Sequence, residues 1–117
     1  MGGIIGIDEG TTGGAKINNC YFDGNIITSD NTRIGGISGG GATIENCGVR
    51  GNISGRMYVG GITGDLFIVN SIRNSYFDGN VSGYQFIGGL VGFNKGNIEN
   101  SYSSGYVSQS RYASQFD

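Results

Sequence analysis

The chain has 117 residues, of which 25 are glycine, two are cysteine and none is proline or histidine. Its seven basic and nine acidic side chains give a net charge of -2 with no run of like charge, so we expect no nucleic acid and no basic membrane face. The glycines follow no Gly-x-y period, which excludes collagen, and no apolar stretch approaches the roughly 18 residues of a membrane-spanning helix, so we expect no membrane insertion.

Two short motifs alternate along the chain. The first, Gly-Gly-[Ile/Leu]-x-Gly, begins at Gly2, Gly35, Gly60 and Gly88, so that its copies lie 33, 25 and 28 residues apart. The second is a ten-residue motif without insertions, I-x-N-[CS]-x-x-x-G-[NY]-[IV], at residues 17–26, 44–53, 72–81 and 98–107. Fixed motifs joined by loops of variable length are typical of a solenoid, in which each repeat buries a face against the next.

We therefore predict an all-β fold, a right-handed parallel β-helix or β-solenoid of about four coils. The repeats lie near residues 2–33, 34–58, 59–86 and 87–108, and residues 109–117 form a C-terminal tail or cap. Each coil should hold three short strands, one on the Gly-Gly motif and one at each end of the ten-residue motif. Stacked coils should pair these strands in parallel and in register, at about 4.8 Å per coil.

In-register stacking places equivalent residues of successive coils above one another in columns. Three apolar columns should form the core: Ile17, Ile44, Ile72 and Ile98; Ile26, Ile53, Val81 and Val107; and Ile4, Ile37, Ile62 and Leu90. We expect Ile72→Ala to cost about 2–5 kcal/mol for this reason. A further column, Asn19, Asn46, Asn74 and Asn100, should form an asparagine ladder of stacked amides at an inward corner.

Two columns alternate in charge, and they hold Asp23, Arg50, Asp78 and Ser104, and Asn18, Glu45, Arg73 and Glu99. Unlike charges on neighbouring coils oppose a one-coil slip, although each exposed pair contributes only about 0.2–1 kcal/mol. The competing interpretation makes Asp23 and Asp78 a catalytic carboxylate pair. Arg50 between them argues against it, because a general acid must keep its proton and an arginine favours the charged carboxylate. We therefore predict no catalytic residue.

Cys20 and Cys47 share a column with Ser75 and Ser101. Side chains of in-register parallel neighbours point the same way, so we favour two reduced buried thiols over a disulfide. Two cysteines without histidine do not make a metal site or a His-based triad, and the Gly-Gly motifs lack the Lys-[Ser/Thr] of a phosphate-binding loop. We therefore expect no metal and no cofactor.

Aromatic residues supply the candidate contacts with a ligand or partner. Tyr21 and Phe22, like Tyr76 and Phe77, are adjacent, and in an extended strand one ring of each pair must face outward. The open ends of a parallel stack invite pairing with another chain. We expect the tail to pack on the last coil through Tyr112 and Phe116, so that its deletion promotes end-to-end self-association.

The fourth repeat, residues 87–107, closely resembles the GLUG repeat. That motif is named for Gly-Leu-x-Gly, met here by Gly89-Leu90-Val91-Gly92, and the other three copies have Ile in place of Leu. The resemblance covers roughly residues 2–108. It implies a β-solenoid segment of a secreted or surface-anchored bacterial protein, where such repeats look like spacers, stalk regions or adhesive surfaces. No catalytic residue belongs to the motif.

We therefore expect a non-catalytic structural or adhesive repeat segment, extracellular or on the bacterial cell surface, and a fragment of a larger protein. The alternative is a carbohydrate- or protein-binding module that uses exposed aromatics on the solenoid. A polysaccharide-acting enzyme or a self-assembling filament subunit is a further alternative. The partners implied are a host or matrix protein, a glycan, or a second copy of the chain end to end.

Overall fold

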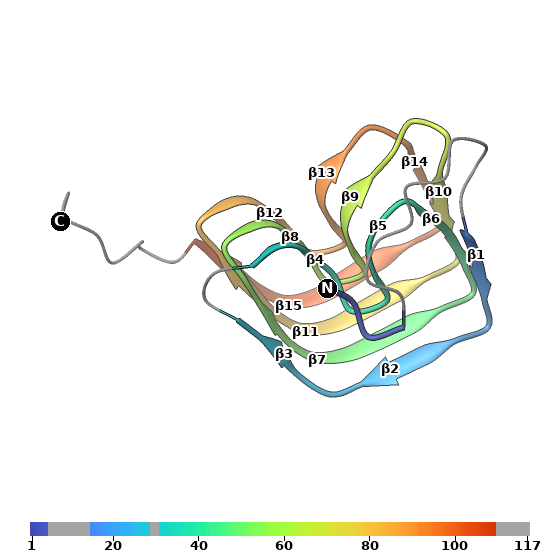
Figure 1. Ribbon diagram of the computed structural model, residues 1–117. Helices are drawn as coiled ribbons and strands as arrows, with labels where there is room; N and C mark the ends of the chain where they lie inside the picture. Colours follow the sequence, from blue (N-terminus) through green and yellow to red (C-terminus); the bar gives the residue numbers. More distant parts are fainter. Residues whose placement is uncertain (5–14, 29–30, 110–117) are drawn as a thin grey trace, which may run out of the picture.

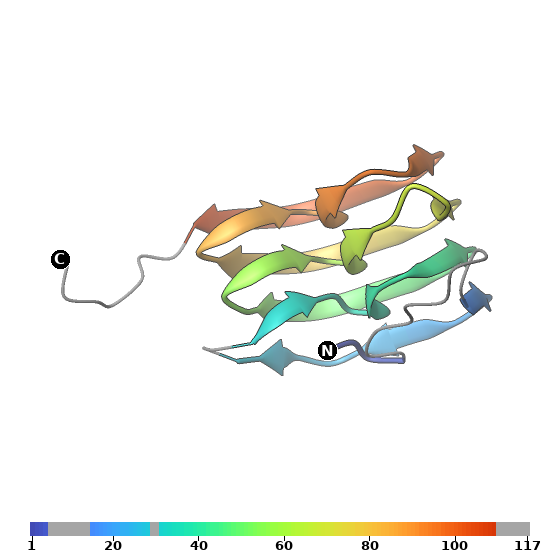
Figure 2. The same ribbon diagram turned by 45° about the horizontal axis from the view of Figure 1, so that its top comes forward.

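A computed structural model describes residues 1–4, 15–28 and 31–109 and shows a parallel β-solenoid of about three turns (Figure 1). The four repeats give four stacked levels in two of its sheets and three levels in the other two, and the part of the stack that each repeat forms is called a coil below. Every strand pairing is parallel, and the described residues contain no helix, which confirms the predicted fold class. The strands form four sheets, and Figure 2 shows the coils lying one above another.

The four sheets follow one another around each coil. Sheet I contains β1 (Ala15–Asn18), β6 (Ala42–Glu45), β10 (Ser71–Arg73) and β14 (Asn97–Glu99). Sheet II contains β2 (Tyr21–Asp23), β3 (Ile26–Ile27), β7 (Gly48–Ser54), β11 (Tyr76–Gly83) and β15 (Tyr102–Gln109). Sheet III contains β4 (Thr32–Ile34), β8 (Met57–Gly60) and β12 (Gln85–Gly88). Sheet IV contains β5 (Ser38–Gly40), β9 (Thr63–Leu66) and β13 (Val91–Asn94).

The predicted register is confirmed. The first two apolar columns pair residue by residue in sheets I and II. In the third column, backbone hydrogen bonds link Ile4 to Ile37, Ile37 to Ile62, and Ile62 to Leu90. The prediction that Ile4 is a core residue is wrong, because its side chain is 42% exposed. Ile4 keeps its column through its backbone, but it lies at the end of that column and no described residue stacks on its far side.

The prediction of three strands per coil is also wrong, because a full coil has four. The Gly-Gly motif is not a strand. It forms the corner between sheets III and IV, where β8 ends at Gly60 and β9 begins two residues after Gly61. A chain that reverses this sharply brings backbone atoms together, and only residues without a Cβ leave room for them.

Each glycine of this corner motif has its own steric reason. A Cβ on Gly60 would overlap with a carbonyl oxygen of the same corner. A Cβ on Gly61 would overlap with the carbonyl oxygen of Gly89 in the next coil, and one on Gly64 would overlap with the backbone of Tyr58 across the corner. The motif therefore combines a tight reversal, close stacking of coils and close contact between sheets III and IV.

The asparagines of the ten-residue motif form the corner between sheets I and II. Asn19, Asn46, Asn74 and Asn100 have φ values of 58°, 54°, 50° and 48°, which is the left-handed region. Asparagine tolerates this conformation better than most residues, which explains why it recurs here. The prediction of an inward asparagine ladder is wrong, because all four side chains are exposed and no hydrogen bond between described residues joins two of them.

The ladder at this corner is made by the Cys/Ser column instead. The Ser75 hydroxyl donates to the carbonyl oxygen of Arg73 (2.8 Å) and accepts from the N–H of Cys47 in the coil before it (3.1 Å). Ser101 repeats the arrangement with the carbonyl of Glu99 (2.9 Å) and the N–H of Ser75 (3.2 Å). Each serine of this column therefore bonds to a carbonyl oxygen of its own corner and to an N–H of the same corner in the preceding coil.

Two predictions are not tested by the described residues. The proposed packing of the tail through Tyr112 and Phe116 lies outside them, as does everything after Gln109. The right-handed winding, expected from the chirality of crossover connections, stays a prediction.

Candidate functional site

The outer face of sheet II carries the most exposed aromatic side chains among the described residues. Tyr21, Tyr102 and Tyr106 are 68%, 62% and 79% exposed, and Tyr76 is partly exposed. The rings of Tyr76 and Tyr102 stack on each other with centroids 5.8 Å apart, in the column that also holds Tyr21. Strand alternation thus turns every tyrosine of this column outward.

The phenylalanines next to these tyrosines point the other way. Phe77 is 1% exposed and belongs to the core, and Phe22 packs partly buried against the same core. The expectation that one ring of each adjacent pair faces outward is therefore met by Tyr21 and Tyr76. Phe77 is not available as a contact residue, because the period of two places it inside the solenoid.

The charged columns of sheets I and II pair as the sequence predicts. The Arg50 Nε lies 3.7 Å from the Asp78 Oδ2, and the Arg73 Nε lies 3.8 Å from the Glu99 Oε2. All four side chains are at least half exposed, so each pair is a weak surface interaction. Asp23 faces Arg50 from the coil on the other side. Among the described residues, no group of three or more His, Cys, Asp or Glu side chains could hold a metal ion.

Asp65 is an ionic feature that the sequence does not reveal. Its carboxylate is buried between sheets III and IV, and its Oδ2 lies 3.5 Å from the Arg33 Nε. The Oδ1 has no hydrogen-bond partner within the described part of the chain. The ion pair links sheet IV to sheet III at the corner, and removal of the arginine would leave a buried carboxylate without its partner, which is unfavourable.

Cys20 and Cys47 are free, as the sequence predicts, although only Cys47 is fully buried. The Cys47 Sγ donates to the carbonyl oxygen of Glu45 (3.2 Å), and burial raises the pKa of its thiol. A buried thiol with a raised pKa is a poor nucleophile, which assigns Cys47 to the packing of the corner.

A shallow groove of about 530 Å³ crosses the outer face of sheet II. Two neighbouring columns line it. One contains Asn52, Asn80 and Tyr106, and the other contains Ile27, Ser54, Ser82 and Ser108. The groove therefore follows the solenoid axis over all four repeats. The signal for these asparagines and serines in the sequence is the Gly-Asn-[Ile/Val]-Ser pattern at residues 51–54 and 79–82, in which Asn and Ser are two residues apart and share one face of a strand.

Three asparagine side chains of the first of these columns form a hydrogen-bonded row. The Asn25 Oδ1 accepts from the N–H of Asn52 (2.9 Å), the Asn80 Nδ2 donates to the Asn52 Oδ1 (3.1 Å), and the N–H of Tyr106 donates to the Asn80 Oδ1 (3.2 Å). An amide ladder thus exists, but it lies on the outer face of sheet II. It fixes the orientation of two amide groups that line the groove.

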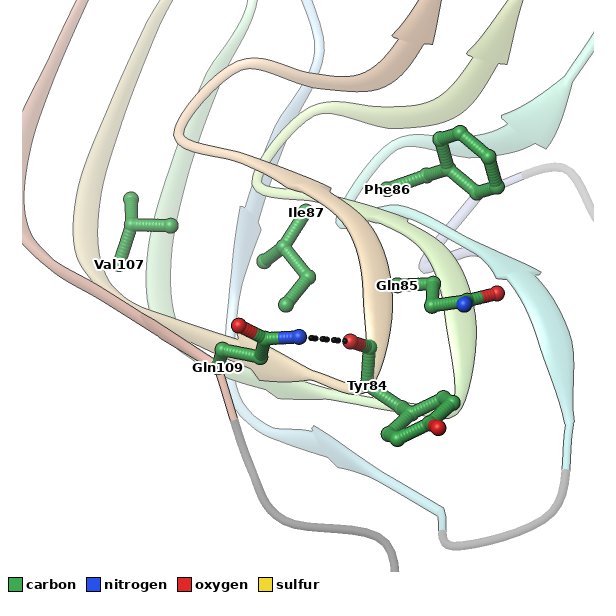
Figure 3. Close-up of a pocket in the computed structure, with 6 residues that line it drawn as sticks. All are labelled: Tyr84, Gln85, Phe86, Ile87, Val107 and Gln109. Atoms are coloured by element: carbon green, nitrogen blue, oxygen red, sulfur yellow. Dashed lines mark hydrogen bonds between the residues drawn. The ribbon is translucent and has the colours of Figure 1, made fainter.

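A second hollow, of about 470 Å³, lies at the last coil. Figure 3 shows Ile87 and Val107 pointing into it, with the Gln109 amide donating to the carbonyl oxygen of Tyr84 (2.9 Å). Val107 is 50% exposed, whereas Val81 below it is fully buried. The hollow is the open end of the core, where no described residue stacks on the apolar columns.

An aromatic cluster occupies the corner between sheets III and IV. The rings of Tyr58 and Phe86 stack with centroids 5.0 Å apart, and Phe93 meets Phe86 at 5.3 Å. The Lys95 ammonium lies 5.3 Å from the centre of the Phe93 ring. Tyr58 and Phe86 both have φ near 55°, as does Arg33 of the same column at 60°. Each of the three precedes an [Ile/Val]-Gly-Gly sequence, a signal that could have located the column.

Residues 83–108 match the sequence profile of the GLUG motif, which confirms the resemblance of the fourth repeat. No curated protein and no solved structure matches the chain. Within the described ranges, no helix is long and apolar enough to cross a membrane.

Proposed function

We propose that this repeat segment is a non-catalytic structural and adhesive part of a bacterial secreted or cell-surface protein, acting as a spacer, stalk or adhesin. The observation that carries the proposal is that the inward and outward columns of side chains have different roles. Inward columns of Ile, Val and Phe hold the fold, while the outward columns of sheet II present tyrosine, asparagine and serine to solvent. Such a solenoid can extend by stacking and vary its outer face without changing its core.

The ionisable groups support a non-catalytic role. The charged residues of sheets I and II pair between coils at 3.7 Å and 3.8 Å, in positions that oppose a slip in register. A catalytic pair of carboxylates would instead share a substrate between them and differ in protonation. Asp23 and Asp78 lie on either side of Arg50, so an arginine stands between the two carboxylates.

The proposal includes end-to-end association through the last coil. Strand β15 is exposed along its whole length, carries no charged side chain and presents a parallel edge with which no described strand pairs. The open end of the core, with Val107 and Ile87, lies beside it. A further coil of the same kind, or a second copy, would cover both the edge and the apolar hollow.

Surface location is tested on intact cells of the source organism with antibodies raised against the purified chain. We expect labelling of unbroken cells or recovery of the protein in the medium, with a cytosolic enzyme as the control for lysis. Labelling that appears only after the cells are broken would overturn the surface role.

End-to-end association is tested by sedimentation velocity over a range of concentrations. We expect Val107→Lys to abolish concentration-dependent association, because it places a charge on the open end of the core. Tyr102→Lys is the matched control, since it adds the same charge to the outer face of the same strand. Equal sedimentation of the wild type and both variants as monomers at every concentration would contradict this part of the proposal.

A further inference from the structure

We propose that the groove on the outer face of sheet II binds a neutral, extended glycan chain that lies along the solenoid axis. This inference rests on the proposed adhesive role and names the chemical class of its ligand. Four features of the groove support this ligand: its course along the axis, the hydrogen-bonding groups that line it, the exposed apolar surfaces at its ends and the absence of charged side chains from its lining.

The two columns that line the groove repeat their polar groups from coil to coil. Ser54 pairs in register with Ser82, and Ser82 with Ser108, so three hydroxyl groups follow one another along the axis. Neighbouring coils lie about 4.8 Å apart, a step comparable with the length of one sugar ring in an extended chain. A linear oligosaccharide laid along the groove would therefore meet an equivalent hydroxyl at each ring.

Several of these polar groups have donors or acceptors that bond to no described residue. The hydroxyls of Ser54, Ser82 and Ser108 make no hydrogen bond to another described residue, although each can donate one bond and accept two. The Asn52 Oδ1 accepts from the Asn80 Nδ2, while the Asn52 Nδ2 makes no hydrogen bond within the described part of the chain and can donate. Because the ladder holds both amides in place, a sugar hydroxyl would find oriented donors, and binding would cost little side-chain entropy.

The ends of the groove carry exposed apolar surfaces. Tyr106 is 79% exposed beside the amide row, and Ile27 is 70% exposed in the serine column at the first repeat. Sugar rings have apolar faces formed by their C–H groups, and a tyrosine offers a flat apolar ring with a polar tip. Tyr106 therefore supplies a stacking surface for one ring, while the hydroxyl and amide columns bond to its neighbours.

The groove has no charge with which to attract an ionic ligand. Its lining contains no Asp, Glu, Lys or Arg side chain. In the nearest charged column on the same face, the one cation, Arg50, lies with its Nε 3.7 Å from the Asp78 Oδ2 and so already has an acidic partner. A neutral ligand avoids the desolvation of an unpaired charge, whereas an acidic polysaccharide would meet no compensating cation in the groove.

A peptide is a poorer fit to this surface. Strands β7 and β11, which carry the middle of the groove, are paired on both sides, so an incoming chain cannot add to the sheet there. Recognition of an extended peptide commonly depends on such backbone pairing, which sheet II offers only at its edges, β15 at one end and β2 and β3 at the other, among the described strands. The groove must instead recognise its ligand through side-chain hydroxyls, amides and one aromatic ring.

The inference is tested by titrating the purified chain with neutral hexasaccharides, cellohexaose, laminarihexaose and mannohexaose, and following backbone and side-chain amide signals by NMR. We expect one of them to shift the signals of Asn52, Asn80, Ser54 and Ser82. Tyr106→Ala should weaken binding about tenfold, and Ser82→Ala several-fold. Tyr102→Ala is the matched control, an exposed tyrosine on the same face of the same strand but outside the groove, and it should change the Kd by less than about twofold.

Three outcomes would overturn the inference. One is that none of the neutral hexasaccharides shifts any signal of the folded chain. Another is an equal loss of binding in Tyr102→Ala and Tyr106→Ala, and the third is tighter binding of an acidic oligogalacturonate than of any neutral probe. Amide dispersion of each variant shows that it is folded. Surface labelling of cells is independent of this titration, so failure of the glycan site and failure of the surface role are distinguishable.

Discussion

The third and fourth coils carry the same motifs in the same register, yet only the third has a described coil on both sides. Ile72, Phe77 and Val81 of the third coil are at most 1% exposed. In the fourth coil, Ile98 is only partly buried and Val107 is 50% exposed. A repeat motif therefore fixes where a side chain points, while its burial depends on the coil that stacks on it.

This difference has an energetic consequence. Stability in a solenoid is approximately a sum of terms within each repeat and terms between neighbouring repeats. The third coil takes part in two interfaces and the fourth in one, among the described residues. Equivalent substitutions should therefore lower the free energy of unfolding more in the third coil than in the fourth. The two losses can be compared for each column.

The largest contrast should come from the apolar column of sheet I. Ile72→Ala leaves a cavity in a closed core and should lower the free energy of unfolding by about 2–5 kcal/mol. Ile98→Ala removes the same atoms from a partly exposed site, so its cost should be less than half as large. Urea unfolding followed by circular dichroism measures both. Equal losses would show that the fourth coil is as closed in solution as the third.

A second contrast tests the corner glycines. Gly61→Ala would press a Cβ against the Gly89 carbonyl and the Phe77 ring, and should cost about 1–3 kcal/mol. Gly89→Ala would meet the Ser103 side chain, which can rotate away, so it should cost less than about 1 kcal/mol. Thermal unfolding of the two variants gives the comparison, and a larger loss for Gly89→Ala would refute the proposed role of coil-to-coil contact.

A third contrast concerns the Cys/Ser ladder. Ser75→Ala leaves the N–H of Cys47 without its acceptor in a buried site, at a cost of about 1–3 kcal/mol. Ser101→Ala removes an equivalent bond to the N–H of Ser75, but the site is partly exposed and water can replace it, so the loss should be about 0.5–1.5 kcal/mol. Chemical denaturation of both variants tests this order, with Ser104→Ala as an exposed serine that should change little.

The smallest effects are expected at the surface ion pairs, where the contrast between coils should vanish. Arg50→Ala and Arg73→Ala each break one exposed pair and should cost no more than about 1 kcal/mol. Both losses should fall toward zero at about 1 M salt, because screening acts on exposed charges. A loss that persists at high salt would mean that packing of the arginine stem, and not its charge, matters.

The register of the solenoid could be predicted from the sequence because the ten-residue motif contains no insertions. Once Ile17, Ile44, Ile72 and Ile98 are aligned, every other position of the motif follows, including the charged columns and the outward tyrosines. Because side chains alternate between the two faces of a strand, Tyr76 then points outward and Phe77 points into the core. The groove could have been read from the same alternation, since Asn52 and Ser54 share the outer face.

The corners could not be predicted in the same way. The Gly-Gly motif was expected to be a strand and proves to be a point where the chain turns, whereas the asparagines lie at a corner as expected but with their side chains outward. A glycine in a sequence indicates only that a Cβ is absent. Which atoms need that space, such as the Gly89 carbonyl beside Gly61, depends on residues brought together by stacking.

The sequence by itself determined the order of the columns, because side-chain direction in a strand has a strict period and the motifs repeat without slips. Only the tertiary structure decided which members of a column are buried, how many strands make a coil and where polar columns form a groove. Burial and close contact depend on neighbouring coils and on the angles between sheets, and these are properties of the stack that no single repeat contains.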